Sequence, residues 1–163
     1  MKIRKLELKD APLMLEWMHD ESVVRDLKTN FTVKTLDDCV SFINGAQNDP
    51  LNTHFAIVDD ADEYMGTVSL KHIESGVAEF GITIRKCAMG KGLSRYGMEK
   101  ILDYGFTQLG LRQIYWCVAP ENARAVRFYD KNGYQRLEAA PQQAQGYTPE
   151  EKKRFIWYEA TPR

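Results

Sequence analysis

The sequence predicts an α/β (α+β) domain with a mixed central sheet of about six to seven strands, flanked by about four helices. Two observations lead to this class. Short apolar runs of strand type fill residues 54–85, whereas apolar residues at helical spacing dominate residues 92–109. The strand, helix, strand order of the later chain implies a parallel strand pair joined by a crossover. We expect the sheet to open between parallel strands around residues 77–85 and 113–118.

The first third of the chain predicts one strand and two helices. Charged and apolar residues alternate over residues 2–8, which is the pattern of a strand. Asp10 is expected to cap a first helix. The apolar residues of that helix recur at helical spacing: Leu13, Met14, Trp17 and Met18. A second helix is expected over residues 33–48, because the Asp49-Pro50 pair that follows is a helix breaker.

The middle of the chain predicts a meander of three strands. Residues 54–58, 64–73 and 77–85 are apolar or rich in β-branched residues. The acidic stretch 59–63 and the turn at 74–76 separate them. Connections this short join antiparallel neighbours most simply.

The last third alternates helices and strands. A helix is expected over residues 92–109, with Gly110 as the residue that ends it. The later elements are expected in this order: strand 113–118, helix 123–131, strand 134–137, polar loop 141–150 and strand 154–160. We expect residues 1–163 to form a single domain.

Length and charge limit the possible functions. The chain has 163 residues, of which 44% are hydrophobic, and a formal net charge of −1. A near-neutral charge argues against a nucleic-acid-binding protein, which usually carries a basic excess. No apolar run approaches the ~20 residues of a membrane span, and residues 1–9 lack the apolar core of a signal peptide. We expect a cytoplasmic protein with no membrane or nucleic-acid partner.

The cysteines and histidines predict no metal site. Their positions show neither a CxxC pair nor the spacing of metal ligands: Cys39, Cys87 and Cys117, with His19, His54 and His72. Scattered cysteines in a cytosolic chain are expected to be reduced thiols.

The glycine-rich turn before the long helix is the sharpest chemical signal. A β-branched strand runs into Gly90-Lys91-Gly92, and a helix opens directly after this turn. The first N–H groups of a helix have no partner within it, and the helix dipole adds partial positive charge there. Glycine also lets a phosphate approach the backbone without meeting a Cβ. Residues 90–94 are therefore a candidate pyrophosphate site, or else a plain strand-to-helix turn, because no P-loop or GxGxxG fingerprint is present.

A second signal lies in residues 121–134. Asn122 can cap a helix, and Ala125 and Tyr129 fall on or near one face of that helix. Gly133 permits a tight exit into the next strand. Physical chemistry alone predicts a capped helix here, in which Tyr129 is as readily an ordinary half-buried aromatic residue as a functional one.

Together, and in this order, the two segments resemble the GNAT superfamily of N-acetyltransferases. The resemblance covers most of the chain and is strongest over residues 78–134, with an acetyl-CoA-binding core at about 77–137. The family's phosphate signature is a Gln or Arg, two residues, a Gly, one residue, then Gly or Ala. It maps to Met89, Gly92 and Ser94, and only Gly92 matches it strictly. A cradle made of N–H groups survives both changes of side chain.

The later segment matches the family better. It carries the family's Asn, Ala, Tyr and Gly-aromatic pattern at Asn122, Ala125, Tyr129 and Gly133. Within the superfamily, the opening layout around Trp17 and the strand at 78–81 are similar to the branch that acetylates ribosomal-protein N-termini.

The resemblance implies a fold, a co-substrate and a set of binding residues. The fold is GNAT-like, and the co-substrate is acetyl-CoA, with no metal. The resemblance assigns the co-substrate to the strand before the turn, the turn itself and the capped helix: Ile82, Thr83, Ile84, Met89, Gly90, Lys91, Gly92, Leu93, Ser94, Asn122, Ala125 and Tyr129.

Acetyl transfer to an amine needs a base and an acid. An aliphatic amine is protonated at pH 7, with a pKa near ~10, so a group must accept its proton. The resemblance places Tyr129 near the thioester sulfur, as general acid. Glu79 is the first choice for the base, because burial in an apolar strand would raise its pKa. A base at His72, an ordered water, and a solvated Glu79 without a catalytic role stay open.

The first helices and the late loop are expected to select the acceptor. Trp17, Asn30 and Phe31 are candidates in the first region, and residues 142–147 in the second. We expect a small-molecule primary amine, such as an amino-sugar nucleotide, to attack acetyl-CoA directly in a ternary complex. A protein N-terminus as acceptor and a non-catalytic CoA-binding module are the alternatives. The protein is expected to be a monomer or a homodimer.

Overall fold

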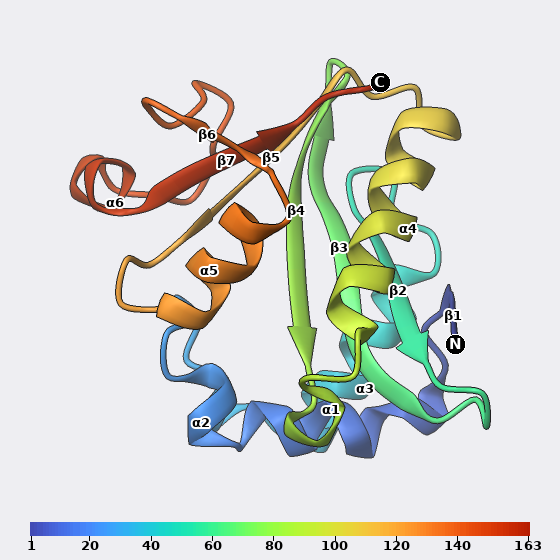
Figure 1. Cartoon of the computed structure of the whole chain (residues 1–163). Coiled ribbons are helices and arrows are strands. Elements are labelled where there is room, and N and C mark those ends of the chain that lie inside the picture. Colours follow the sequence, from blue (N-terminus) through green and yellow to red (C-terminus); the bar gives the residue numbers. More distant parts are fainter.

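A mixed seven-stranded sheet organises the chain, which the computed structural model describes in full, residues 1–163 (Figure 1). In space the strands follow the order β1-β2-β3-β4-β5-β7-β6. Their bounds are β1 Lys2–Lys5, β2 Thr53–Val58, β3 Tyr64–Glu74, β4 Val77–Ile84, β5 Gln113–Val118, β6 Gln135–Leu137 and β7 Ile156–Ala160. All neighbours are antiparallel except β4 and β5, so the predicted single parallel pair is confirmed.

Six α-helices accompany this sheet. They are α1 Ala11–Met18, α2 Glu21–Val24, α3 Leu36–Ala46, α4 Leu93–Thr107, α5 Ala123–Lys131 and α6 Pro149–Arg154. α4 and α5 pack on one face, in front of the sheet in Figure 1, and α1 and α3 pack on the other. None of the helices is both long and apolar enough to span a membrane.

Alternation along the central strands gives each face its own core. Ala78 and Phe80 of β4 pack in one cluster with Met98 of α4. Ala56 and Val58 of β2 pack in another cluster with residues of α1 and α3. Because successive strand residues point to opposite faces, a single sheet can hold both helical layers.

β4 and β5 are paired only at one end. Three residue pairs join them: Val77 with Gln113, Ala78 with Ile114, and Glu79 with Tyr115. Beyond these pairs β4 continues along β3 to Ile84, and β5 continues along β7 to Val118. The backbone edges of residues 80–84 and 116–118 that face the gap therefore have no strand partner. The predicted opening between the parallel strands is confirmed at the predicted residues.

The structure has two more helices than the four that the sequence predicts. α2 and α6 are short, and side-chain caps rather than a long apolar period start them. Asp20 accepts a hydrogen bond from the N–H of Ser22 at the start of α2, and Thr148 and Glu151 form a capping box in α6. α6 thus begins inside the predicted polar loop 141–150.

Two N-terminal boundaries also differ from the prediction. The second helix, expected from residue 33, begins at Leu36, because Thr35 and Asp38 form a capping box there. The first strand, expected to reach residue 8, ends at Lys5, and a 3₁₀ turn follows at Leu8–Asp10.

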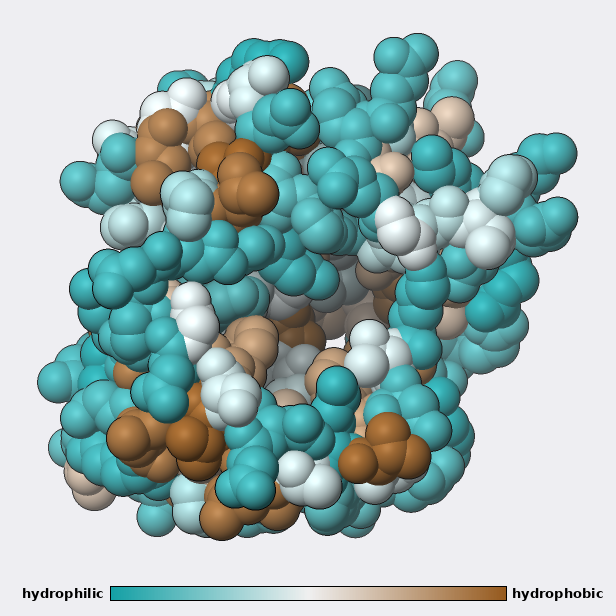
Figure 2. Space-filling model, turned by 180° about the vertical axis from the view of Figure 1, so that it is seen from behind, coloured by the Kyte–Doolittle hydropathy of each residue, from teal (hydrophilic) through white to brown (hydrophobic).

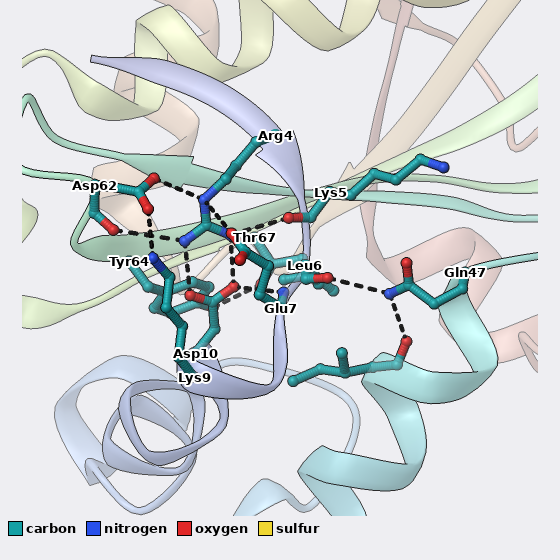
Figure 3. Close-up of polar contacts among 11 residues, drawn as sticks. Arg4, Lys5, Leu6, Glu7, Lys9, Asp10, Gln47, Asp62, Tyr64 and Thr67 are labelled. Atoms are coloured by element: carbon teal, nitrogen blue, oxygen red, sulfur yellow. Dashed lines mark hydrogen bonds and ion pairs between the residues drawn. The ribbon is translucent and has the colours of Figure 1, made fainter.

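Asp10 does not cap α1 with its side chain, contrary to the prediction. The residue is 1% exposed, and its carboxylate accepts hydrogen bonds from Arg4 at 2.8 and 2.9 Å (Figure 3). It also accepts one from the backbone N–H of Glu7 at 2.9 Å, which closes the 3₁₀ turn. Arg4 donates further to Asp62, in the turn between β2 and β3, at 2.8 Å. This cluster fastens the edge strand β1, three strands away from the gap between β4 and β5.

Candidate active site

A cavity of about 310 Å³ lies where β4 and β5 separate. Its walls come from these two strands, α5, the segment after α2 and the late loop. Several of the residues predicted from the sequence line it: Glu79, Ile82, Thr83, Asn122, Ala125 and Tyr129. The fold therefore gathers the predicted acid, the predicted base and part of the predicted cofactor site around one cavity, which we call the donor cavity.

A second cavity, of about 290 Å³, lies on the side of the sheet covered by α1 and α3. Trp17 and Phe31, two of the predicted substrate residues, line it. The two cavities share wall residues: Thr29, Phe31, Lys71, Gly81, Ile82 and Thr83. Because of this shared wall they adjoin, and Figure 2 shows a hollow near the middle of the face seen from behind. We call the second one the acceptor cavity.

The glycine turn stands at the N-terminus of α4. Gly90 and Gly92 both have a φ of 79°, a left-handed conformation that favours glycine. A Cβ at either position would meet no atom within 4 Å, so the turn is open. The first hydrogen bond of α4 runs from the N–H of Tyr96 to the carbonyl of Gly92. The N–H groups of residues 93–95 precede it and have no partner within the helix. This open helix start fits a pyrophosphate.

Arg124 of α5 brings a guanidinium to this turn. Its Nη1 lies 2.8 Å from the Sδ atom of Met89, although the two residues are 35 positions apart in the sequence. Met89 stands where the family signature has Gln or Arg, so a basic group occupies that neighbourhood in space. Sequence reasoning missed Arg124, because only the packing of α5 beside the turn reveals it.

Tyr129 is held in an aromatic cluster beside the donor cavity. The residue is 7% exposed, and its ring centroid lies 5.5 Å from that of Trp116 and 5.1 Å from that of Tyr158. Burial raises the pKa of the phenol above its ordinary value of 10.0, so the hydroxyl keeps its proton at neutral pH. Asn122 starts the helix that carries Tyr129, because its Oδ1 accepts a hydrogen bond from the N–H of Ala125 at 3.3 Å.

Glu79 projects from the opposite face of the sheet, since its neighbours Ala78 and Phe80 pack beneath α4. It is 3% exposed. The hydroxyl of Tyr147 donates a hydrogen bond to its Oε2 at 2.5 Å. The structure thus places Glu79 as a buried and oriented carboxylate, and not as the solvated strand residue of the alternative prediction. Tyr147 belongs to the late loop that the sequence indicates for substrate selection.

Two basic side chains also approach Glu79. Lys71 Nζ lies 4.0 Å and His72 Nε2 lies 3.8 Å from Glu79 Oε1. Neighbouring strand residues normally point to opposite faces, but the register of β3 with β4 shifts between Lys71 and Glu74, and His72 has a φ of 53°. This β-bulge brings both side chains to one carboxylate.

The outer wall of the donor cavity joins distant parts of the chain. Lys28, after α2, lies with its Nζ 4.5 Å from the ring centre of Tyr147. The same Nζ is 3.1 Å from a carboxylate oxygen of Glu151 in α6 and donates to the carbonyl of Gly146. These contacts tie the segment after α2 to the late loop.

Several predicted residues do not line either cavity. Asn30 is exposed, and its side chain accepts a hydrogen bond from Thr32 Oγ1 at 2.6 Å, at the start of a 3₁₀ turn. Ile84 and Leu93 are buried in the core, so only their backbone groups can meet a cofactor. Residues 89–92 form the turn before α4, and Ser94 lies in the first turn of that helix.

The chain also has cavity residues that the sequence analysis did not single out. Lys71 lines both cavities, and Cys117 lines the donor cavity. Lys71 faces Glu79 because the two residues are direct partners between β3 and β4. Strand register supplies this information, and the register follows from the length and shape of the turn at 74–76, which the sequence pattern alone does not fix.

The comparison with known proteins supports the resemblance. The profile of the family described as "Acetyltransferase (GNAT) domain" matches residues 1–135. The chain is 32% identical over 141 residues to an uncharacterized N-acetyltransferase, p20, of Bacillus licheniformis, across 83% of this chain and 79% of that protein. It is 34% identical over 103 residues to a spermidine N(1)-acetyltransferase of Vibrio cholerae serotype O1, across 62% of this chain and 60% of that protein.

A solved structure shows the same fold. The spermidine N-acetyltransferase from Vibrio cholerae in complex with CoA and spermine is similar with a TM-score of 0.81 at 24% identity, covering 98% of this chain and 94% of that chain. Membership of the ribosomal-protein branch stays a prediction, because the two Vibrio cholerae proteins are named as spermidine acetyltransferases. Since the family profile spans both the gap between β4 and β5 and the glycine turn, the chain belongs to the GNAT family, and it is an acetyl-CoA-dependent N-acetyltransferase.

Proposed function

We propose that this acetyltransferase acts on the primary amine of a small molecule, by direct attack within a ternary complex. The observation that carries the proposal is the pair of adjoining cavities, which share part of their walls. One cavity lies between the separated strands and the other lies under α1 and α3. Two molecules can therefore meet at one junction without a covalent enzyme intermediate. An amino-sugar nucleotide belongs to the proposed class of acceptor.

The donor cavity and the glycine turn are proposed to bind acetyl-CoA, which supplies the thioester carbonyl. The N–H groups at the start of α4 hold the pyrophosphate, with Arg124 as an additional cation. The unpaired edge of β4 at Ile82, Thr83 and Ile84 binds the pantetheine arm through backbone groups, and Asn122 lines the same path. Binding through the backbone explains why the departures at positions 89 and 94 from the family signature are tolerable.

Tyr129 and Glu79 are proposed to move the protons. Glu79 accepts the proton of the amine, directly or through a water, and Tyr129 gives its proton to the leaving thiolate. Support comes from their placement, because both line the donor cavity but project from opposite faces of the sheet. Tyr147 keeps the Glu79 carboxylate oriented through its hydrogen bond.

Cys117 is the one thiol that lines the donor cavity. Burial raises its pKa to about 11, so at neutral pH it is a protonated thiol and a poor nucleophile. This protonation state favours direct transfer over an acetyl-cysteine intermediate.

Spermidine is a second candidate acceptor. It is favoured by the names of two of the relatives described above, which are spermidine acetyltransferases. The other two alternatives, a protein N-terminus and a non-catalytic CoA-binding module, have no such support from those names.

Thermal unfolding with acetyl-CoA, CoA or ATP tests the donor site. A ligand present at ~100 times its dissociation constant should stabilise the fold by about 2.7 kcal/mol, a shift of a few degrees. We expect this shift with acetyl-CoA and CoA but not with ATP, and thiol release when small amines are added. A protein that acetyl-CoA does not stabilise, or that binds it and acetylates no small amine, would refute the proposal.

A further inference from the structure

The charges of the acceptor cavity are mainly positive. The charged residues that line it are Lys34, Asp38 and Lys71. The carboxylate of Asp38 already accepts hydrogen bonds from the N–H and the hydroxyl of Thr35, at 2.8 and 3.1 Å. These bonds lower the pKa of Asp38 and tie it to the cap of α3. Lys34 forms no ion pair of its own, although its charge also helps to lower the pKa of Asp38, so its ammonium can still donate hydrogen bonds to a ligand.

Lys71 stands at the junction of the two cavities. Its Nζ is 4.0 Å from Oε1 of Glu79. Its Cε and Nζ both lie 3.4 Å from where a Cβ of Gly81 would be, so the side chain lies across β4 at a residue that has no side chain of its own. The ammonium is therefore held beside the proposed base, where it faces an incoming acceptor.

The field of Lys71 reaches His54 on the neighbouring strand β2. His54 lines the acceptor cavity, and its pKa is lowered to about 4 by burial and by the charge of Lys71. His54 is therefore neutral at pH 7, with Nδ1 2.6 Å from the hydroxyl of Ser69. Neutral histidine and hydroxyl groups beside two lysines form a wall suited to an anion.

The rest of the acceptor cavity is apolar and small. Its side chains include five large apolar groups: Met14, Trp17, Met18, Phe31 and Phe42. A volume of about 290 Å³ fits a compact organic molecule rather than a folded partner. The cavity thus offers an apolar wall, several hydroxyls and a positive charge.

A polycation is a poor match for this lining. An extended polyamine needs carboxylates at intervals along its path, because each ammonium loses water when it binds. Three carboxylates line the joined cavities, Asp26, Asp38 and Glu79, and of these only Glu79 is buried. Lys71 is adjacent to it and would repel a second ammonium.

We infer that the acceptor is a compact amine that also carries an anionic group, a carboxylate or a phosphate, which Lys34 and Lys71 bind while the amine faces Glu79. This inference rests on the proposed function and names its substrate class. It separates the specificity of this chain from that of the spermidine acetyltransferases to which it is similar.

Matched pairs of amines test the inference. Phenylalanine against phenethylamine isolates a carboxylate, O-phosphoethanolamine against ethanolamine isolates a phosphate, and spermidine supplies the polycation. We expect the anionic member of at least one pair to have a kcat/KM about tenfold or more above that of its neutral partner and of spermidine. The pair that shows the preference identifies the anionic group. A higher kcat/KM for spermidine or for the neutral members would overturn the inference while the proposed function stands.

Lysine variants connect the preference to the cavity. Lys34→Met and Lys71→Met should each lower kcat/KM for the anionic amine about tenfold and so reduce its preference over the neutral partner. Lys5→Met is the matched control, because Lys5 lies on the edge strand β1 and its ammonium points away from the contacts drawn in Figure 3. A preference that survives Lys34→Met and Lys71→Met would also overturn the inference.

A binding measurement separates failure of the inference from failure of the proposed function. Thermal unfolding of the CoA-bound protein with each amine does not depend on turnover. If no amine is acetylated but the anionic amine stabilises the protein, and Lys34→Met removes this effect, the anion-binding part of the inference holds and the proposed function fails. If neither turnover nor stabilisation prefers the anionic amine, both fail.

Discussion

Tyr129 and Glu79 have opposite surroundings that suit opposite proton tasks. Aromatic rings surround Tyr129, and burial raises its pKa and keeps it protonated. A hydroxyl donor and two basic side chains surround Glu79. Environments that separate an acid from a base in this way are typical of active sites.

Removal of the Tyr129 hydroxyl should slow the chemical step without damage to the fold. We expect Tyr129→Phe to lower kcat about 100-fold, with a KM for acetyl-CoA that stays within about twofold. Tyr134→Phe is the matched control, because Tyr134 packs on the same Trp116 ring at 5.2 Å without lining the donor cavity. Equal rates for Tyr129→Phe and Tyr134→Phe would show that Tyr129 is only a packing residue.

Loss of the Glu79 carboxylate should give a defect that depends on pH. Near pH 7 the acceptor amine is protonated, and we expect Glu79→Gln to lower kcat/KM by about 100-fold or more. As the pH approaches the amine pKa of ~10, the amine loses its proton without help and the difference from the wild type should shrink. Steady-state rates over pH 7 to 10 check this, and a constant ratio across that range would contradict the role as base.

At the scale of elements, the closeness of α4 to the sheet depends on a glycine. A Cβ at Gly97 would lie 2.4 Å from Cδ1 of Ile57 and 3.2 Å from Cγ1 of Val68. The helix therefore rests directly on β2 and β3, and its N-terminus is fixed where the glycine turn begins.

Gly97→Ala should consequently destabilise the protein by about 1 to 3 kcal/mol, because an added methyl group overpacks the core. Gly45 of α3 is the matched control, since a Cβ there would meet nothing within 4 Å. Gly45→Ala should stabilise the protein by about 0.5 to 1 kcal/mol. Urea unfolding of the two variants measures both values, and a stabilising Gly97→Ala would contradict the packing described.

Elements with strong local signals are the ones that the sequence predicts well. β5 and α5 have their predicted bounds, because an apolar run and the Asn122 cap define them without help from tertiary structure. α2 and α6 are four and six residues long and show no apolar period. Their existence depends on caps and on packing beside the cavity, which a periodicity argument does not detect.

The candidate site divides in the same way. The placement of Glu79 and Tyr129 around one cavity follows from motif order and from the separation of two parallel strands. The presence of Lys71 and Arg124 in the site follows from strand register and helix packing. Such contacts depend on tertiary structure, so local patterns in a single sequence do not predict them.

At the scale of the whole molecule, stability should fall in mild acid through His54. Its pKa of about 4 in the folded protein is below the ordinary 6.5, chiefly because of burial. Between these two pH values the unfolded chain binds a proton that the folded chain does not. The contribution of neutral His54 to the free energy of unfolding is therefore fully present above pH 6.5, and it is lost as the pH falls towards 4.

The free energy of unfolding should drop between pH 7 and pH 5 by about 2 kcal/mol more in the wild type than in His54→Gln. Urea unfolding at the two pH values gives this difference directly. Both proteins have the same carboxylates, so the effect of carboxylate titration on stability cancels in the comparison. Equal losses in the two proteins would show that folding does not lower the pKa of His54.

The donor cavity takes its walls from residues between Asp26 and Phe155, and β5 needs β7 along its outer edge. During synthesis, the glycine turn and Tyr129 leave the ribosome well before the residues that enclose the site. A nascent chain therefore carries Tyr129 for some time before the donor cavity beside it is complete. At a synthesis rate of about 5 to 20 residues per second this interval lasts roughly seconds. Acetyl transfer is thus a property that the polypeptide acquires only with its last strand.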